Sequence, residues 1–241
     1  MDRFRRILSM VVCTILYSTV HMSAQHYTVT ELPMHVESHF HALGEDGSVA
    51  GTLRPPDGSN HPALWDKGAL TTLPIDGMAL SRNAVGQTVG LAYFPTVPWT
   101  KPLEWDQDGY RFWPQPAGAI YGAQVNAIND GGMGVCTFSY GNRFDPAWCT
   151  RAGFSILPGL GGSWPFAWDI NTHGVAAGTA DTPSGAQHVV VWDPQGQILD
   201  YGTLGGSWAN GIKLGKAKGR GYSKFRYLQF NNFAISTLFR A

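Results

Sequence analysis

The pentapeptide Leu160-Gly161-Gly162-Ser163-Trp164 returns 44 residues later as Leu204-Gly205-Gly206-Ser207-Trp208. A motif that recurs at a spacing of about 40 to 50 residues is typical of a repeat protein, whose supersecondary units are laid end to end. Each copy closes one unit and opens the next. The second copy therefore marks the start of a further unit near residue 208.

Composition predicts an all-β protein. The 241 residues include 30 Gly, 15 Pro and 9 Trp, and only 14% are charged. Many turn formers and aromatics favour strands joined by tight turns. Charge divides the chain, because residues 25–212 hold 16 acids and 7 bases, a net of −9, whereas residues 213–241 hold 7 bases and no acid. An acidic central region argues against a nucleic-acid partner, since phosphates require Lys and Arg.

The amino terminus is typical of a secretory signal peptide over residues 1–24. Three arginines precede an apolar run, Ile7 to Val20, and Met22-Ser23-Ala24 offers a small-residue cleavage site. The run is short for a bilayer span, although an uncleaved anchor or a buried helix remains an alternative. We therefore expect a mature chain from near Gln25 that is secreted or extracellular, or periplasmic, and does not span a membrane after cleavage.

Aligned columns extend the repeat along residues 25–212. The first column is an apolar residue followed by a small or polar one, with a glycine four positions after the first. Asn and Gly tolerate the left-handed backbone of a tight turn, so each member predicts a hairpin. The members are Leu43-Gly44, Arg82-Asn83, Ile128-Asn129, Ile170-Asn171 and the incipient Ile212, and the glycines are Gly47, Gly86, Gly132 and Gly174.

Three more columns follow each turn. The second is expected to end the second strand, and the third lies on the third strand. A Trp in three of the four units of the third column indicates packing between units. The second column is Gly51, Gly90, Cys136 and Gly178; the third is Trp65, Trp105, Cys149 and Trp192; the fourth is Leu73-Pro74, Trp113-Pro114, Leu157-Pro158 and Tyr201-Gly202.

Four short strands in about 43 residues are typical of a propeller blade. The expected fold is an all-β, propeller-like array of about four four-stranded blades, either incomplete and open or closed by both chain ends. An early copy of the fourth column, Leu32-Pro33, supplies an N-terminal strand that closure would use. The alternative is a two-sheet sandwich with coincidental spacing.

Three strings resemble the bacterial extracellular HAF repeat, over about residues 27–212. The resemblance implies an exported, propeller-like repeat protein, and it brings no established reaction or catalytic residue. Its namesake triplet is degraded here, and Arg82 replaces the apolar residue of the first column. The strings are Ala79 to Gly90, His61-Pro62-Ala63-Leu64-Trp65 and Gly202-Thr203-Leu204-Gly205-Gly206-Ser207-Trp208.

The pattern stops after Ile212. The basic run from Lys213 replaces the expected Asn and Gly, and the tail to Ala241 carries no Trp column. We interpret residues 213–241 as an aberrant basic tail left by a frameshift or truncation. The alternative is a genuine basic tail that binds anionic surfaces. The alternative reading frames of the coding DNA after codon 212 distinguish the two.

The two cysteines of the mature chain predict a disulfide. Cys136 and Cys149 replace a Gly and a Trp in successive columns of one unit, and a hairpin centred near Asn142-Arg143 would place them opposite each other. Export supplies the oxidising environment. The alternative is two unlinked buried thiols.

No residue pattern indicates catalysis or a cofactor. His35, His39 and His41 cluster once, without a converging acid column, so solvent-facing turn histidines are favoured over a metal site. The acidic run at Glu104, Asp106 and Asp108 is expected to be a solvated hairpin turn.

Trp99 and Trp113, which lie in the less regular second unit, and Trp168 are freer candidates for a binding surface. The favoured function is therefore an exported, non-enzymatic binding or interaction module whose partner is a carbohydrate or another extracellular protein. The alternatives are a glycan-acting enzyme on a propeller scaffold and a nonfunctional truncated product.

Overall fold

The computed structural model describes residues 38–44, 46–96, 98–203, 205–206, 208–215, 224–230 and 233–235. Contacts divide the chain into two compact units, and every described residue lies in the second, Pro33–Ala241. The expected signal peptide over residues 1–24, the early strand at Leu32-Pro33, and His35 lie outside the described residues.

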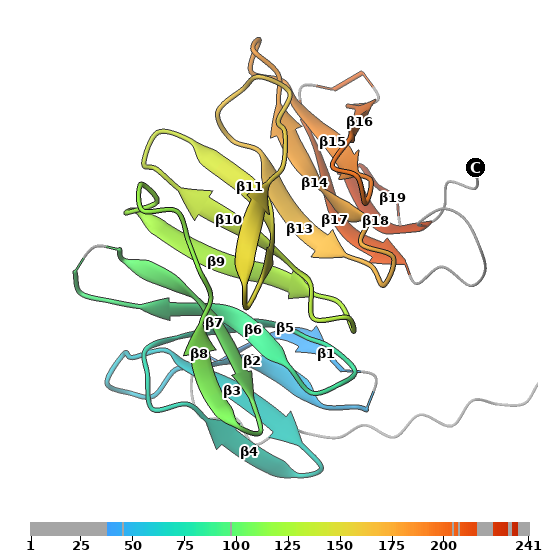
Figure 1. Ribbon diagram of the computed structural model, residues 1–241. Coiled ribbons are helices and arrows are strands. Elements are labelled where there is room, and N and C mark those ends of the chain that lie inside the picture. Colours follow the sequence, from blue (N-terminus) through green and yellow to red (C-terminus); the bar gives the residue numbers. More distant parts are fainter. Residues whose placement is uncertain are drawn as a thin grey trace, which may run out of the picture. The chain divides into compact units, whose positions relative to one another are not determined.

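Four antiparallel four-stranded sheets follow one another along the chain, which confirms the expected fold class (Figure 1). Within each sheet the strands pair in chain order. The first sheet holds β1 (His39–Leu43), β2 (Val49–Leu53), β3 (His61–Asp66) and β4 (Ala69–Thr72), and the second β5 (Gly77–Arg82), β6 (Thr88–Tyr93), β7 (Thr100–Asp106) and β8 (Gly109–Phe112). The third holds β9 (Gly122–Ile128), β10 (Gly134–Ser139), β11 (Phe144–Thr150) and β12 (Gly153–Ile156), and the fourth β13 (Phe166–Ile170), β14 (Ala176–Asp181), β15 (Gln187–Trp192) and β16 (Ile198–Gly202).

A fifth sheet of three strands follows the fourth. It contains β17 (Ala209–Gly215), β18 (Lys224–Phe230) and β19 (Phe233–Ile235), in that order. The expected domain boundary after residue 212 therefore falls inside β17, and part of the segment 213–241 is in strands.

The turn between the first and second strands is built in the same way in the second, third and fourth sheets. Gly86, Gly132 and Gly174 have positive φ, as does Gly47 in the first sheet. Asn83, Asn129 and Asn171 each accept backbone N–H bonds of their own turn. The side-chain amides reach further: Asn83 Nδ2 donates to the Asn129 carbonyl, and Asn129 Nδ2 donates to the Asn171 carbonyl, both at 3.0 Å. This Asn ladder joins the first strands of three successive sheets.

Glycines of the second column lie inside the second strand, so the expectation that they end it is wrong. In each of the four four-stranded sheets the first strand carries a bulge opposite this position, between Ala79 and Ser81 in the second sheet. A bulge brings the backbone of the first strand close to its partner. A Cβ on Gly90 would lie 1.9 Å from the Met78 carbonyl oxygen, so only glycine fits there.

Apolar side chains between neighbouring sheets form the core. Trp192 is fully buried with Ala127 and Val135 of the third sheet, and Trp105 packs with Leu73 of the first. Each thus contacts the preceding sheet. Trp65, in the first sheet, is only half-buried.

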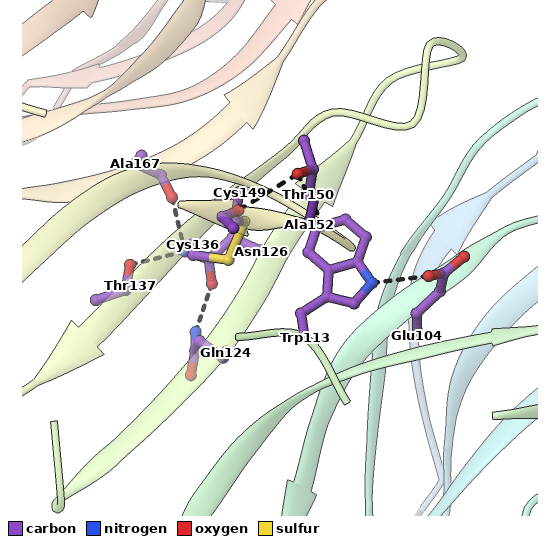
Figure 2. The surroundings of a disulfide bond; sticks show 11 residues. Glu104, Trp113, Gln124, Asn126, Cys136, Thr137, Cys149, Thr150, Ala152 and Ala167 are labelled. Atoms are coloured by element: carbon purple, nitrogen blue, oxygen red, sulfur yellow. Dashed lines mark hydrogen bonds between the residues drawn. A yellow bond between two sulfur atoms is a disulfide. The ribbon is translucent and has the colours of Figure 1, made fainter. Parts of the chain in front are cut away.

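The predicted disulfide is formed. Cys136 on β10 and Cys149 on β11 are bonded, with Cα atoms 6.0 Å apart, inside the core between the second and third sheets (Figure 2). The expected pairing, with Cys136 directly opposite Cys149, is wrong by two residues. Cys136 lies opposite Ala147, and Cys149 lies opposite Gly134. The disulfide therefore joins diagonal rather than directly opposed positions.

Candidate functional site

The two ends of each four-stranded sheet carry different connections between strands. Antiparallel alternation places the turn between the first and second strands at one end, and the loop between the second and third strands at the other. Connections from one sheet to the next also lie at this other end, because each leaves a fourth strand and enters a first strand. The Asn ladder aligns the turns of successive sheets, so the opposite ends are aligned as well. We call this opposite end the loop end.

An exposed aromatic pair lies at the loop end of the second and third sheets. Trp99 precedes β7 and Tyr121 precedes β9, and their rings make an edge-to-face contact at 5.7 Å. The two side chains are 53% and 46% exposed. Thr100 fixes their backbones, since its Oγ1 donates to the Ala123 carbonyl and lies within 2.9 Å of the Ala123 amide. Gly141, with φ of 90°, leaves room for the Tyr121 ring.

A second aromatic group, the aromatic strip, lies at the loop end between the third and fourth sheets. It consists of Trp164, Phe144, Phe166 and Trp168. Phe144 makes edge-to-face contacts with Trp164 at 4.8 Å and with Phe166 at 5.3 Å, and Phe166 stacks on Trp168 at 4.3 Å. Trp164 is 44% exposed, and the other three rings are half-buried.

The motif Leu160 to Trp164 holds the aromatic strip in place. The Gly162 amide donates to the Asp181 carbonyl of the fourth sheet at 2.8 Å, and the Ser163 carbonyl accepts from the Phe144 amide of the third at 2.9 Å. A Cβ on Gly162 would lie 2.5 Å from the Asp181 oxygen, so the close approach requires glycine. The expected role of the motif as a joint between units has this physical basis.

Trp113 is not a surface residue, so its assignment as a free binding candidate is wrong. It is 3% exposed, and its Nε1 donates to Glu104 at 2.7 Å (Figure 2). Trp99 does lie at the loop end, whereas Trp168 lies in the middle of β13 and stacks on Phe166, which begins that strand at the loop end. Trp168 is the bulged residue of β13, and its Nε1 is buried without a hydrogen-bond partner among the described residues.

Two acids of the predicted run, Glu104 and Asp106, form an ion cluster rather than part of a solvated turn, whereas Asp108 is exposed in the β7–β8 turn as expected. Glu104 is fully buried and accepts hydrogen bonds from Trp113, Gln87 and Arg151. Asp106 pairs with Arg111 at 2.6 Å and with Arg151 at 2.8 Å. Arg151 comes from the β11–β12 turn, so the cluster links the second and third sheets at the end opposite the loop end.

Hydrogen bonding keeps both acids ionised. Burial alone would raise the pKa of Glu104, but the bonds from Arg151, Trp113 and Gln87 outweigh it and lower that pKa. The Arg111 hydrogen bond lowers the pKa of Asp106. Ionised carboxylates that are paired with arginines in this way stabilise the fold and are poor proton donors at neutral pH.

Histidines of the first sheet lie close to one another and to a serine. The His39 and His41 rings lie 6.5 Å apart, and burial, followed by the charge of His39, lowers the pKa of His41. No three His, Cys, Asp or Glu side chains within the described ranges are grouped to hold a metal ion.

Ser59 Oγ lies 3.0 Å from His61 Nε2, which resembles a nucleophile and its base. However, the Ser59 hydroxyl also bonds Asp57, and the Ser59 and Asn60 amides donate to Asp57 and Asp76. These two amides are therefore occupied and cannot stabilise an oxyanion.

Comparison with known proteins supports the fold. No protein-family model and no curated protein sequence matches the chain. Its structure is similar to the crystal structure of TolB from Acinetobacter baumannii, with 12% sequence identity and a TM-score of 0.54. The match covers 80% of this chain and 51% of that one, so the chain spans about half the length of that protein. The likeness shows a propeller-like fold alone.

Within the described part of the chain, no helix is long and apolar enough to cross a bilayer.

Proposed function

We propose that this chain is an exported, non-enzymatic binding module of the HAF-repeat type, which contacts its partner through the aromatic side chains of the loop end. The observation that carries the proposal is the exposure of Trp99, Tyr121 and Trp164, all on one end of the sheets. Large aromatic side chains exposed together are typical of interaction sites, where Trp and Tyr dominate the binding energy.

Rigid positioning favours binding. Trp99 and Tyr121 contact each other, and the loop that carries Trp164 is hydrogen-bonded to two sheets. A side chain that is already ordered loses little conformational entropy when a partner binds. The loop end is therefore pre-organised for recognition.

The glycan-acting enzyme is less well supported. A glycosidase needs two carboxyl groups that face the substrate, one of them able to donate a proton. The closely placed acids Glu104 and Asp106 are paired with arginines at the end opposite the aromatic groups. At the loop end, burial raises the pKa of Asp181, which suits a proton donor, but a catalytic pair would require a second carboxylate beside it.

Sedimentation with isolated bacterial cell envelopes tests the proposal. We expect the purified full-length mature chain to sediment with washed envelopes, and Trp99→Ala combined with Trp164→Ala to remain in the supernatant. Tyr110→Ala is the matched control, because Tyr110 is 45% exposed on the outer strand β8, away from the loop end. Equal sedimentation of the double variant and the wild type would refute a role for the loop end, provided that both show the same circular dichroism.

A further inference from the structure

The hairpin loop between β10 and β11 connects the exposed aromatic groups of the loop end. It closes with a 3.0 Å hydrogen bond that the Arg143 carbonyl accepts. At the start of the loop, Gly141 lies against the Tyr121 ring, which a Cβ at this position would approach to 2.8 Å. The residue that follows the loop, Phe144, contacts the Trp164 ring. Arg143 therefore lies in the loop that separates the exposed aromatic pair from Trp164.

Arg143 is both ordered and accessible. The central carbon of its guanidinium group lies 4.6 Å from the centroid of the Tyr140 ring, and this ring packs against the core between the second and third sheets. A planar guanidinium that stacks on a fixed ring loses little freedom when a partner binds. The Arg143 side chain is nevertheless 58% exposed, so its donors face solvent from a fixed platform.

The ion pair of Arg143 leaves most of its donors available. Among the described residues, Asp145 is the one acceptor of its guanidinium, at 3.3 Å, which is longer than the roughly 2.7 to 2.9 Å of a strong charge-assisted bond. Arg111 and Arg151, in contrast, approach Asp106 to 2.6 and 2.8 Å. Because a guanidinium carries several N–H donors in a planar fork, Arg143 retains the geometry that binds a carboxylate with two parallel bonds.

The charge of the chain limits the kind of partner. Residues 25–212 hold 16 acids and 7 bases, a net of −9, so the protein repels an extended anionic surface such as an acidic polysaccharide or an anionic bilayer. A single exposed cation among aromatic rings still attracts a single carboxylate. The charge distribution therefore favours a partner with one acid between apolar groups.

The angles between the exposed rings suit side chains better than sugars. The Trp99 and Tyr121 rings cross at 80°. The Phe144 and Trp164 rings cross at 88°. Perpendicular rings cover part of each other's faces and form an uneven surface rather than a flat platform. Apolar side chains pack into such a surface, and Trp, Tyr and Arg are the residues that contribute most to binding between proteins.

We propose that the loop end binds a peptide segment of another protein, whose carboxylate pairs with Arg143 while its apolar side chains contact the aromatic pair and Trp164. Because rings lie on both sides of Arg143, the segment continues on both sides of its acid. The carboxylate is therefore an Asp or Glu side chain rather than a chain terminus. The inference rests on the proposed function and specifies the class of partner.

Three treatments of the bacterial envelopes test the inference. One portion is digested with protease, which is then inhibited and washed away. A second is oxidised with periodate, which cleaves the vicinal diols of sugars. In a third, carbodiimide and ethanolamine convert carboxylates to neutral amides. We expect protease to abolish sedimentation of the full-length mature chain, amidation to weaken it, and periodate to leave it unchanged.

Variants assign the carboxylate contact to Arg143. Arg143→Gln should weaken binding to untreated envelopes by roughly tenfold or more, as loss of a charged contact at the centre of an interface does. Amidation should weaken wild-type binding by the same factor and leave the binding of Arg143→Gln unchanged. Lys67→Gln is the matched control, because it removes one positive charge from the exposed β3–β4 turn at the opposite end and should bind as the wild type. Circular dichroism and unfolding midpoints identify any variant that fails to fold.

The outcomes separate the two proposals. If protease-digested envelopes bind the wild type as before, the partner is a polysaccharide or a lipid and the peptide inference is wrong, although the loop end would still be a binding surface. Equal binding of folded Arg143→Gln and the wild type would refute the carboxylate contact. If untreated envelopes bind the Trp99→Ala and Trp164→Ala double variant as well as the wild type, the proposed function itself fails.

Discussion

Replacing Arg151 with Met should lower the free energy of unfolding by about 2 kcal/mol. Arg151 donates charge-assisted hydrogen bonds to Glu104 and Asp106 across two sheets, and each such bond contributes about 1.5 to 3 kcal/mol. Arg111, 3.3 Å from Glu104, remains as a counter-charge, and Arg151 is itself half-exposed to screening solvent. These two factors reduce the estimate below the roughly 3 to 5 kcal/mol of a fully buried pair.

The same cluster makes stability depend on pH. Because the pKa of Glu104 is lower in the folded chain than its unfolded value of about 4.3, the ionised group stabilises the fold fully above roughly pH 5. That stability is lost as pH falls through the folded pKa. Asp106, with its pKa also lowered, acts in the same direction. Glu104→Gln should therefore be less stable at pH 7 and lose less stability between pH 5 and 3 than the wild type.

Urea unfolding followed by tryptophan emission measures these effects, since Trp113 donates to Glu104. Glu104→Gln, Arg151→Met and the double variant form a cycle whose coupling energy should be about 1 to 3 kcal/mol at pH 7. A coupling energy near zero, or an unchanged pH profile in Glu104→Gln, would show that the contact between the two sheets contributes nothing to stability.

Two further predictions concern the joint and the disulfide. Gly162→Ala should lower the free energy of unfolding by about 1 to 3 kcal/mol through steric overlap with Asp181, and it should weaken envelope binding. Gly159→Ala is the control, because its Cβ would lie 3.4 Å from Pro165, and it should change little. Equal unfolding midpoints for the two variants would contradict the steric argument. Replacing both Cys136 and Cys149 with Ala should lower the free energy of unfolding, measured with urea, by about 3 kcal/mol for a sequence separation of 13. A loss below about 1 kcal/mol would argue that the disulfide does not stabilise the fold by restricting the unfolded chain.

The repeat made the strands and their order predictable. Turn glycines, such as Gly86, recur at similar distances because each sheet repeats the same backbone, so the four aligned columns locate the hairpins without any contact information. The bulge was not predictable in this way. Only the register between β5 and β6 shows that Gly90 faces a carbonyl in mid-strand rather than the end of a strand.

The buried ion cluster could not be read from spacing, because its partners lie far apart in the chain. Glu104 and Arg151 are separated by 47 residues and meet only when the second and third sheets pack together. A signal for Trp113 did exist. It shares the first position of the fourth column with Leu73 and Leu157, which are both buried, and only Tyr201 at that position is exposed, so its place in the repeat favours burial.

The repeated Leu-Gly-Gly-Ser-Trp motif combines two roles that act on different residues. Gly162, which has no side chain, lets the backbone of the loop approach Asp181 of the fourth sheet closely. Its tryptophan at 164 lies at the end of the same loop, exposed and in contact with Phe144. Because the backbone of the joint is hydrogen-bonded on both sides, the position of the exposed ring is fixed by the packing of the sheets. A change that loosens the joint must therefore also displace the ring, so stability and binding at this site should fail together.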